Sequence, residues 1–546
     1  MTDRPASSRA AGEWGTVTLG DMLHLQAVRR PDAPAIADAD HVLTYRRLDE
    51  RTDRLALGLL RTGLQRGDAV VFQAGNEVDT VVMFYGVLKA GLVPVCSIPN
   101  HRLHEIGLIA AATRAKAHFV QAGYRNYDLT GLSEQLVERC PEVRVRIVAG
   151  GDGGPGTVSF DALCDTGSAD EARATVAAVQ HELSADDIAV FQLSGGTTGV
   201  PKIIPHTHAT YQSVAARWST NLQWDERSVN LHFLPVMHHA GLGTAVVPTH
   251  FVGGLLVLAR QLDPALITEL IARHRVTWMH FNMALLEPLA THMASNTCDV
   301  SSVTHFSWTF IRPELSARAE QLLDAVAVGS FGMGEGVHLS ARRDDPASVR
   351  LHTCGSTIGA HDEVKVLEPE TEREVPLGDI GEFAFRGPSV IRAYFENADA
   401  NASSFTSDGF LRSGDLGRSA IIDGRLVHTV EGRLKDQISR GGEKFMAAEL
   451  EALLANHPDV REVVAVGAPD PRFGERVCVF VVRKDGVTAD PAELQRRFVA
   501  YLDDLQVAKF KWPERVEIVD EIPKTGINKP LKHVLRERLV LASKED

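Results

Sequence analysis

Hydrophobic and polar positions alternate along the first 290 residues in a way that predicts a layered α/β fold. Residues 42–65 predict a short strand followed by an amphipathic helix, because leucines recur on one helical face. The apolar segment 68–76 predicts a buried strand, and residues 79–97 predict a helix followed by another strand. This alternation of strand and helix is typical of folds built on largely parallel sheets.

The pattern changes after about residue 350, where short apolar runs are separated by glycines and charged turns. These runs predict a small β-rich subdomain. The last 110 residues then predict a separate α+β domain, with helices and strands of their own. We therefore expect a large N-terminal domain over residues 1–432, a hinge at 433–435 and a small mobile C-terminal domain over 436–546.

Composition narrows the class of protein. The chain has 546 residues, of which 44% are hydrophobic and 23% charged, as in ordinary globular proteins. With 57 Lys and Arg against 71 Asp and Glu, the net charge of −14 argues against a nucleic-acid partner. The longest apolar stretch, 246–259, contains Pro248 and His250 and is too short to span a membrane. Without a signal peptide or paired cysteine motifs, we expect a reduced cytoplasmic enzyme.

The strongest local motif is the segment 194–202, SGGTTGVPK, which directly follows an apolar strand. Its glycines let backbone N–H groups approach an anion closely, and Lys202 adds a cation. It is not a Walker A loop, because Gly-Lys-Ser/Thr is absent and Pro201 precedes the lysine. Taken alone, the segment is equally well explained as a flexible Gly/Thr turn.

This segment resembles the phosphate loop of the ANL superfamily, which comprises acyl- and aryl-CoA synthetases, peptide-synthetase adenylation domains and luciferases. Further segments resemble the motifs of that superfamily in the same order, namely 234–241, 331–336, 387–401, 408–415, 431–444 and 523–529. The nearest branch is the stand-alone aryl-acid adenylating enzymes, the 2,3-dihydroxybenzoate- and salicylate-AMP ligases. The resemblance implies a large domain of two layered α/β lobes and a β-rich subdomain, followed by a small mobile domain.

The activity implied is ATP-dependent activation of an aromatic carboxylic acid to its acyl-adenylate, with release of pyrophosphate. The acyl group then passes to the phosphopantetheine thiol of an aryl carrier protein in a siderophore or natural-product pathway. The first step joins an anionic nucleophile to a polyanion, so it needs cations, Mg²⁺ and oriented N–H groups rather than a covalent residue. The resemblance thus implies ATP and Mg²⁺ as cofactors, and it allows a homodimer.

Residue roles follow from the same resemblance. The nucleotide would be held by Ser194, Gly195, Gly196, Thr197, Thr198, Gly199, Lys202, Phe331, Gly332, Met333, Asp415 and Arg433. Phe331 would stack on adenine, Asp415 would accept both ribose hydroxyls, and Glu335 would bind Mg²⁺ through hard oxygen ligands. Lys529, together with His238, would serve the adenylation step. Lys435 would be the hinge residue, and Gly441 and Gly442 would line the thiol channel. Each of these side chains also has an ordinary structural explanation.

The acid subsite is assigned by the resemblance to His238, His239, Ala240, Thr244 and Gly334. His239 stands where the dihydroxybenzoate enzymes have the Asn that recognises an ortho hydroxyl, and Ala240 stands where they have Tyr. A different, larger or differently substituted aryl acid is therefore expected, with salicylate and 2,3-dihydroxybenzoate as poor substrates unless His239 replaces the Asn.

Three alternatives remain. Coenzyme A could replace the carrier protein, because both present a pantetheine thiol. The adenylate could serve ATP-dependent diazotisation, or the chain could be a non-catalytic scaffold. A metal site at the pairs His238–His239 or His206–His208 is disfavoured, because neither pair has a third ligand at helical or hairpin spacing.

Overall fold

A computed structural model describes residues 15–151, 154–194, 201–281, 283–308, 313–369, 371–434, 437–523, 530 and 532–542. Its residues divide into two compact units. The first unit takes in residues up to 99, 113–193 and 203–432, and the second takes in 100–112, 194–202 and the chain from 433. The second unit therefore includes two short segments from much earlier in the sequence.

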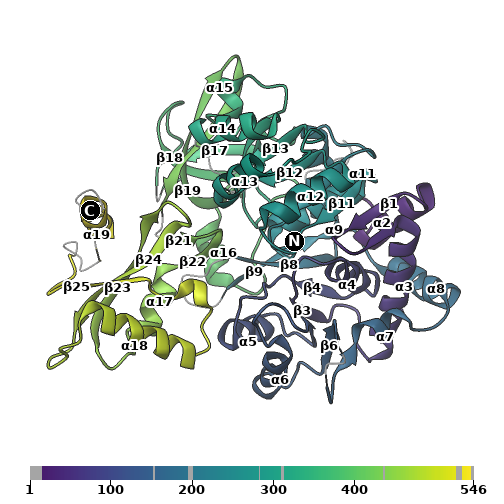
Figure 1. The fold of residues 1–546 in the computed structure, drawn as a ribbon, viewed down its shortest axis with the longest axis horizontal. Helices are drawn as coiled ribbons and strands as arrows, with labels where there is room; N and C mark the ends of the chain where they lie inside the picture. Colours follow the sequence, from purple (N-terminus) through teal and green to yellow (C-terminus); the bar gives the residue numbers. More distant parts are fainter. Residues whose placement is uncertain are drawn as a thin grey trace. The chain divides into compact units, whose positions relative to one another are not determined.

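The first unit contains a seven-stranded sheet in the order β7-β6-β5-β3-β4-β8-β9 (Figure 1). Its strands are β3 (Ala69–Gln73), β4 (Val93–Val95), β5 (Ala117–Gln121), β6 (Val145–Ala149), β7 (Val158–Ser159), β8 (Ile188–Ser194) and β9 (Lys202–Thr207). The pairings from β7 to β8 are parallel. Every residue of β3 is buried, as its continuous apolar run requires in a sheet covered on both faces.

A second sheet of nine strands has the order β16-β15-β14-β13-β12-β10-β11-β1-β2. Its strands are β1 (Pro34–Ala37), β2 (Val42–Thr44), β10 (Val229–His232), β11 (Leu255–Leu258), β12 (Trp278–Phe281), β13 (His305–Trp308), β14 (Val326–Gly332), β15 (His338–Ser340) and β16 (Ser356–Thr357). In this sheet, β14, β13, β12, β10, β11 and β1 pair in parallel. At the edges, β2, β15 and β16 pair antiparallel.

Helices cover both sheets, as parallel strands need crossover connections. Those of the first unit are α2 (Leu19–Arg29), α3 (Tyr45–Arg61), α4 (Val78–Lys89), α6 (Leu129–Arg139), α7 (Phe160–Cys164), α8 (Ala169–Glu182), α9 (His208–Asn221), α10 (His239–Gly241), the π-helical η1 (Leu242–Val246), α11 (Val247–Val252), α12 (Pro264–His274), α13 (Met283–Ser295), α14 (Pro313–Leu323), α15 (Ala347–Arg350) and α16 (Ala398–Ser404). Figure 1 shows α12, α13 and α14 beside β12 and β13, and their apolar side chains share one core.

The expected helix after residue 42 is confirmed as α3. Thr44 caps it by accepting a hydrogen bond from the N–H of Arg47 at 3.3 Å, and the leucines Leu48, Leu55 and Leu59 are fully buried. The expected pair over 79–97 is confirmed as α4 and β4. In these elements the apolar positions that the sequence pattern placed on one face are the buried ones, as a layered α/β fold requires.

A third, antiparallel sheet forms the β-rich part of the first unit, in the order β17-β18-β19-β20. Its strands are β17 (Glu363–Leu367), β18 (Gly381–Arg386), β19 (Leu411–Ile422) and β20 (Arg425–Arg433). This confirms the predicted change of pattern after residue 350. No described helix combines the length and apolar character needed to cross a membrane.

The second unit has a five-stranded sheet in which β25 pairs with β24 beside the order β22-β21-β24-β23. Its elements are α5 (Leu103–Ala112), β21 (Gln437–Arg440), β22 (Glu443–Met446), α17 (Ala447–Leu454), β23 (Val460–Asp470), β24 (Gly474–Arg483), α18 (Pro491–Asp504), the 3-10 helix η2 (Lys509–Lys511), β25 (Arg515–Ile518) and α19 (Lys532–Ala542). Buried Lys511 pairs with Glu449 at 2.6 Å and with Glu105 of α5 at 3.2 Å.

Candidate active site

The expected nucleotide ligands divide into those that the structure describes and those that it does not. Ser194 ends β8 and Lys202 begins β9. The predicted residues that lie outside the described part of the chain are Gly195, Gly196, Thr197, Thr198, Gly199, Lys435 and Lys529. Arg433 is placed as the last residue of β20, but its side chain is not described. Their roles remain predictions.

Glu335 lies in a turn that follows β14 and is held rigidly. Gly336 has a φ of +90°, and a Cβ there would lie 1.9 Å from the carbonyl oxygen of Ser389, so only glycine fits. The N–H of Ile391 donates to the carbonyl oxygen of Glu335 at 2.9 Å, and the hydroxyl of Tyr394 donates to its carboxylate, also at 2.9 Å. The sequence analysis assigned no role to Tyr394. It lies in the segment 387–401 that resembles a family motif, but no spacing within that segment singles it out.

The carboxylate of Glu335 suits a hard cation. The residue is only 4% exposed, and its carboxylate has no Lys or Arg ion-pair partner among the described residues. Burial, followed by the nearby charge of Glu335, raises the pKa of Tyr394 far above its ordinary value, so the tyrosine stays a neutral donor. A buried carboxylate without a protein cation fits the expected Mg²⁺ ligand.

Asp415 is positioned by an irregularity between β18 and β19. Glu382 pairs with Leu416 and Ala384 with Arg412, so three residues of β19 stand opposite one residue of β18. This bulge turns Asp415 into the molecule, where it is 3% exposed, and Ser413 accepts a hydrogen bond from its N–H at 3.0 Å. A fixed carboxylate with two oxygens matches a vicinal diol.

Phe331 lies near the end of β14 and is half-buried. Its ring stacks against Phe385 of β18, with centroids 6.2 Å apart and planes inclined by 23°. Two backbone hydrogen bonds close the turn that follows. The N–H of Met333 donates to the carbonyl oxygen of Val337, and the N–H of Gly336 donates to that of Met333, both at 3.1 Å. Gly332, the last residue of β14, is exposed. The buried ring of Phe385 therefore supports Phe331, the residue expected to stack on adenine.

Four of the five expected acid-subsite residues lie in and just before α10 and η1, whereas the fifth, Gly334, lies in the turn after β14. His238 is exposed and accepts a hydrogen bond from the N–H of Ala240 at 3.3 Å, which caps α10. Thr244 lies in η1 and donates to the carbonyl oxygen of Ala240 at 2.5 Å, while its hydroxyl contacts Nε2 of His280 at 2.6 Å. A π-helical turn at this position is typical of functional sites.

His239, in contrast, is buried and lies in a cluster of rings that the sequence reading did not foresee. The His206 ring stacks on the His239 ring, with centroids 5.3 Å apart and planes inclined by 19°. Nε2 of His206 donates to the carbonyl oxygen of Gly334 at 2.6 Å. A Cβ on Gly243 would lie 2.9 Å from the His239 ring. The imidazole therefore packs closely against both Gly243 and the His206 ring.

A chain of hydrogen bonds runs through His239. Its Nε2 lies 3.3 Å from Nε2 of His338, its Nδ1 lies 3.4 Å from the hydroxyl of Tyr211, and that hydroxyl accepts from Gln192 at 2.8 Å. Nδ1 of His338 lies 3.3 Å from the carbonyl oxygen of Gly336. Only tertiary structure brings these residues together, since they come from β8, α9, α10 and β15.

The imidazoles of this cluster are neutral at ordinary pH. Burial lowers the pKa of His206 and of His338 to about 4. Burial, followed by the neighbouring His338 and His206, lowers the pKa of His239 well below its usual range. The cluster can therefore offer hydrogen bonds but no positive charge to an acid.

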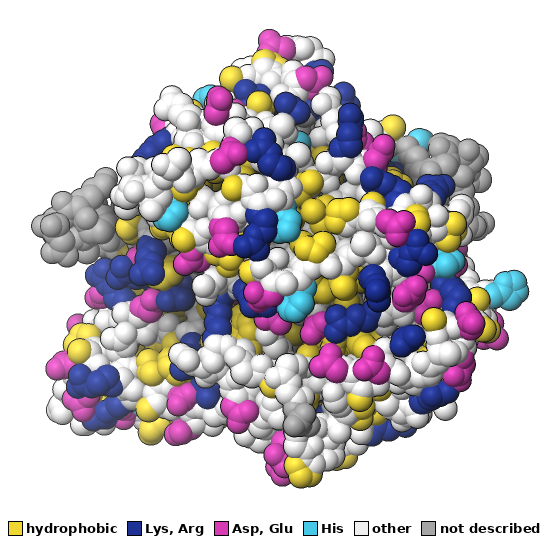
Figure 2. All heavy atoms as spheres, turned by 45° about the vertical axis from the view of Figure 1, so that its right-hand side comes forward, with side chains coloured by type: hydrophobic (Ala, Val, Ile, Leu, Met, Phe, Trp, Pro, Cys, Tyr) yellow, Lys and Arg dark blue, Asp and Glu magenta, His cyan; other side chains and the backbone are white. Residues whose placement is uncertain are grey.

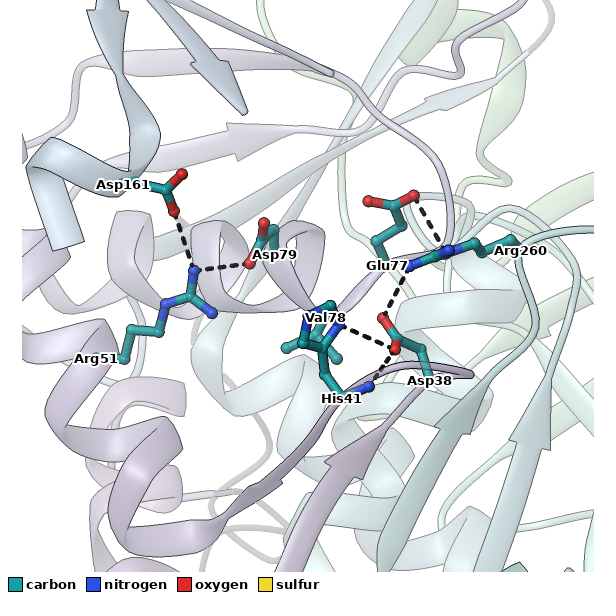
Figure 3. A pocket seen from close by; sticks show the side chains of 8 residues that line it. All are labelled: Asp38, His41, Arg51, Glu77, Val78, Asp79, Asp161 and Arg260. Carbon is teal, nitrogen blue, oxygen red and sulfur yellow. Dashed lines mark hydrogen bonds and ion pairs between the residues drawn. The ribbon is translucent and has the colours of Figure 1, made fainter. Parts of the chain in front are cut away.

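Groups that could hold a metal elsewhere are few. Among described residues the only three-residue group with metal-ligand spacing is Asp38, Asp40 and His41, and it does not include the histidine cluster. Arg260 lies 2.8 Å from Asp40 of this group and thus supplies a cation already. Figure 3 shows the same guanidinium beside Asp38, at 3.8 Å, and Glu77, at 3.4 Å. Within the described part of the chain, neither the pair His238–His239 nor the pair His206–His208 belongs to such a group.

On the face shown in Figure 2, Lys and Arg side chains are interspersed with Asp and Glu rather than gathered into an area of one sign.

Comparison with known proteins gives the class. The family model described as "AMP-binding enzyme" matches residues 23–395, and that described as "AMP-binding enzyme C-terminal domain" matches residues 449–529. The chain therefore belongs to the family of AMP-binding enzymes, and the resemblance to the ANL superfamily is confirmed. It is an enzyme of the adenylate-forming kind, with a large N-terminal and a smaller C-terminal domain.

Three similar proteins illustrate the family. A "salicylyl-CoA synthase / salicylate adenylyltransferase" of Streptomyces sp is 37% identical, covering 97% of this chain and 95% of the relative. The "2,3-dihydroxybenzoate-AMP ligase" of Bacillus subtilis (strain 168) is 35% identical, covering 97% and 95%. The apo structure of Mycobacterium smegmatis MbtA is 31% identical with a TM-score of 0.72, covering 98% of both chains.

Proposed function

We propose that this enzyme activates an aromatic carboxylic acid with ATP and transfers the aryl group to the phosphopantetheine thiol of an aryl carrier protein. The observation that carries the proposal is Glu335, a buried carboxylate without a described ion-pair partner, in a turn that Gly336 and Tyr394 hold within the matched AMP-binding segment. The names of similar proteins, which act on salicylate or 2,3-dihydroxybenzoate, support an aryl acid.

Each residue has a defined task in this proposal. Asp415 accepts both ribose hydroxyls, Phe331 covers the adenine, and the segment 194–202 binds phosphate oxygens through its N–H groups. Glu335 holds Mg²⁺, which when bound neutralises phosphate charge. Lys529 bridges the attacking carboxylate and the nucleotide, where a flexible point charge stabilises the transition state.

The thiol step is assigned to the second unit. Gly441 and Gly442 have φ values of +59° and +93°, and a Cβ on Gly442 would meet nothing within 4 Å. An open loop of glycines suits the passage of a narrow pantetheine arm. We assign residues 433–435 as the hinge between the domains 1–432 and 436–546, with Lys435 as its pivot.

Two variants separate the half-reactions. Lys529→Ala should lower ATP–pyrophosphate exchange by at least about 100-fold, since it removes a charge that acts on the transition state. It should spare thiolation from preformed aryl-adenylate. Gly442→Leu should do the reverse. Gly486→Leu is the matched control, because Gly486 has a φ of +85° and equally open surroundings. Equal losses in both steps for both variants would contradict the assignment.

Coenzyme A is the second candidate acceptor, because one similar protein is named as a salicylyl-CoA synthase. Single-turnover transfer from preformed aryl-adenylate to carrier protein and to coenzyme A, at equal thiol concentration, distinguishes the two. Faster transfer to the carrier supports our proposal. A panel of benzoates, aminobenzoates, picolinates and cinnamates in the exchange assay identifies the acid, and no exchange with any of them would overturn the proposed function.

A further inference from the structure

We propose that His338 is a specificity-determining residue, because it occupies the hydrogen-bonding edge of His239 that would otherwise recognise an ortho substituent of the acid. The inference rests on the proposed function, which places the acid beside His239 and Ala240. His338 was assigned no role by the sequence pattern. It lies on β15, 99 positions from His239 in sequence, and becomes its neighbour only in the folded chain.

The direction of each hydrogen bond follows from the partners at the two ends. The carbonyl oxygen of Gly336 can only accept, so Nδ1 of His338 carries the hydrogen. A neutral imidazole carries a hydrogen on only one of its two nitrogens, so Nε2 of His338 is an acceptor. Nε2 of His239 must therefore donate to it. Nδ1 of His239 is then an acceptor for the hydroxyl of Tyr211. Partner chemistry thus assigns a single tautomer to each ring.

The far end of the chain agrees with this assignment. The hydroxyl oxygen of Tyr211 accepts from the side-chain amide of Gln192 at 2.8 Å, so its own hydrogen remains for His239. Burial raises the pKa of Tyr211 well above its ordinary value, which keeps it a donor. Every donor meets an acceptor from Gln192 to Gly336.

Both nitrogens of His239 are consequently occupied by protein partners. Gly243 and the His206 ring both pack against the imidazole, which restricts its rotation away from these partners. A phenolic or amino substituent at the ortho position of an acid therefore finds no free hydrogen-bonding atom on His239. The protein should gain little from an ortho hydroxyl, unlike a pocket built to bind that group.

Replacing His338 should make the Nε2–H group of His239 available to the substrate. In His338→Leu, Nε2–H of His239 becomes a buried donor without an acceptor, which is unfavourable until a substrate oxygen supplies one. In His338→Gln, the amide oxygen can reach the position of the lost Nε2 and restore the acceptor. The two variants remove the same ring but differ in whether His239 is satisfied, so they separate hydrogen bonding from a change of volume.

The experiment measures ATP–pyrophosphate exchange with benzoate and 2-hydroxybenzoate for the unmodified enzyme and both variants. We expect a ratio of kcat/KM for 2-hydroxybenzoate over benzoate within about threefold of one in the unmodified enzyme. His338→Leu should raise this ratio about tenfold, as one new neutral hydrogen bond can provide. The change should lie in KM, because the bond is made equally in ground and transition states. His338→Gln should keep the original ratio.

Tyr211→Phe tests the other nitrogen and also serves if His338→Leu does not fold. It leaves Nδ1 of His239 as an unsatisfied acceptor, so it should raise the ratio for 2-aminobenzoate or 2-hydroxybenzoate over benzoate. The inference is overturned if both His338 variants shift the ratio alike, if neither shifts it, or if the unmodified enzyme already prefers 2-hydroxybenzoate by more than about 30-fold. Exchange with none of these acids but with others would disprove only this inference, whereas no exchange with any aryl acid would disprove the proposed function.

Discussion

The hydroxyl of Tyr394 lies 2.9 Å from a carboxylate oxygen of Glu335, and both side chains are buried. This bond orients the carboxylate in the same way that outer hydrogen bonds orient metal ligands. Since 59 residues separate the two in sequence, the bond also ties the turn after β14 to the segment before α16.

Tyr394→Phe should therefore weaken the use of Mg²⁺ without abolishing adenylation. We expect the Mg²⁺ concentration for half-maximal exchange to rise about tenfold, the lower end of the effect of losing an outer-shell partner. Glu335→Gln should have a much larger effect. Tyr127→Phe, a half-buried tyrosine in the loop before α6, is the control. An unchanged Mg²⁺ dependence in both Tyr394→Phe and Glu335→Gln would contradict the ligand assignment.

Gly336→Ala should be strongly destabilising, since its Cβ would lie 1.9 Å from the carbonyl oxygen of Ser389 at a φ of +90°. Backbone displacement on top of left-handed strain should lower the free energy of unfolding by about 3 kcal/mol or more. Gly378→Ala has a similar φ of +96° but open surroundings, so it isolates the strain alone at about 1 kcal/mol. Urea denaturation compares the two, and equal losses would show that the contact with Ser389 relaxes freely.

Lys89→Met should cost about 3–5 kcal/mol of unfolding free energy, because it removes the fully buried cation that Asp49 and Asp53 share. Among the described residues, Asp53 would keep only its 3.3 Å contact with Arg173, and Asp49 only its 2.7 Å contact with His24. The Lys89 side chain is fully buried and its Nζ lies 2.5 Å from Asp49 and 2.6 Å from Asp53. Its charge helps to hold the pKa of Asp49 low, against the raising effect of burial. Lys116→Met, whose partner Glu142 is exposed, should change stability by less than about 1 kcal/mol. Similar midpoints for both variants in chemical denaturation would contradict a structural role for Lys89.

Stability should fall steeply between pH 7 and pH 5. Burial lowers the pKa of many histidines, to about 4 in His232, His250 and His338 and to about 3 in His118 and His280. Between these values and the unfolded value of about 6.5, the unfolded chain binds more protons, so the free energy of unfolding rises with pH. The stabilisation is complete above about pH 7 and is lost progressively as the pH falls toward 4.

Each such histidine contributes up to about 1.4 kcal/mol per pH unit inside that window. Burial raises the pKa of Glu443 to about 7 and also raises the pKa values of Asp53, Glu77 and Asp79. These carboxyls work in the opposite direction, but they are fewer than the histidines. Denaturation midpoints at pH 7.5, 6.0 and 5.0 measure the slope, and His232→Leu should reduce it by about one proton. A slope near zero would show that the histidines titrate normally in the folded protein.

Local sequence was sufficient for the elements and for the family. The leucine spacing after residue 42 predicted α3, the apolar run at 68–76 predicted β3, and the glycine-separated runs after 350 predicted the antiparallel sheet. These features depend on side-chain period and on backbone preferences of neighbouring residues, which the sequence carries directly. The roles of Glu335 and Asp415 come from the resemblance of their short motifs to the family and remain predictions, although both residues are buried as a binding role requires.

The environment of the candidate acid subsite could not be predicted in this way. The sequence showed His239 at an important position but left open which of its nitrogens was available. Tertiary structure decided this point, because Tyr211 from α9 and His338 from β15 meet His239 only when the strands and helices pack. A hydrogen-bond direction depends on atoms a few ångströms apart in space, and no periodicity in the chain records which distant residues will supply them.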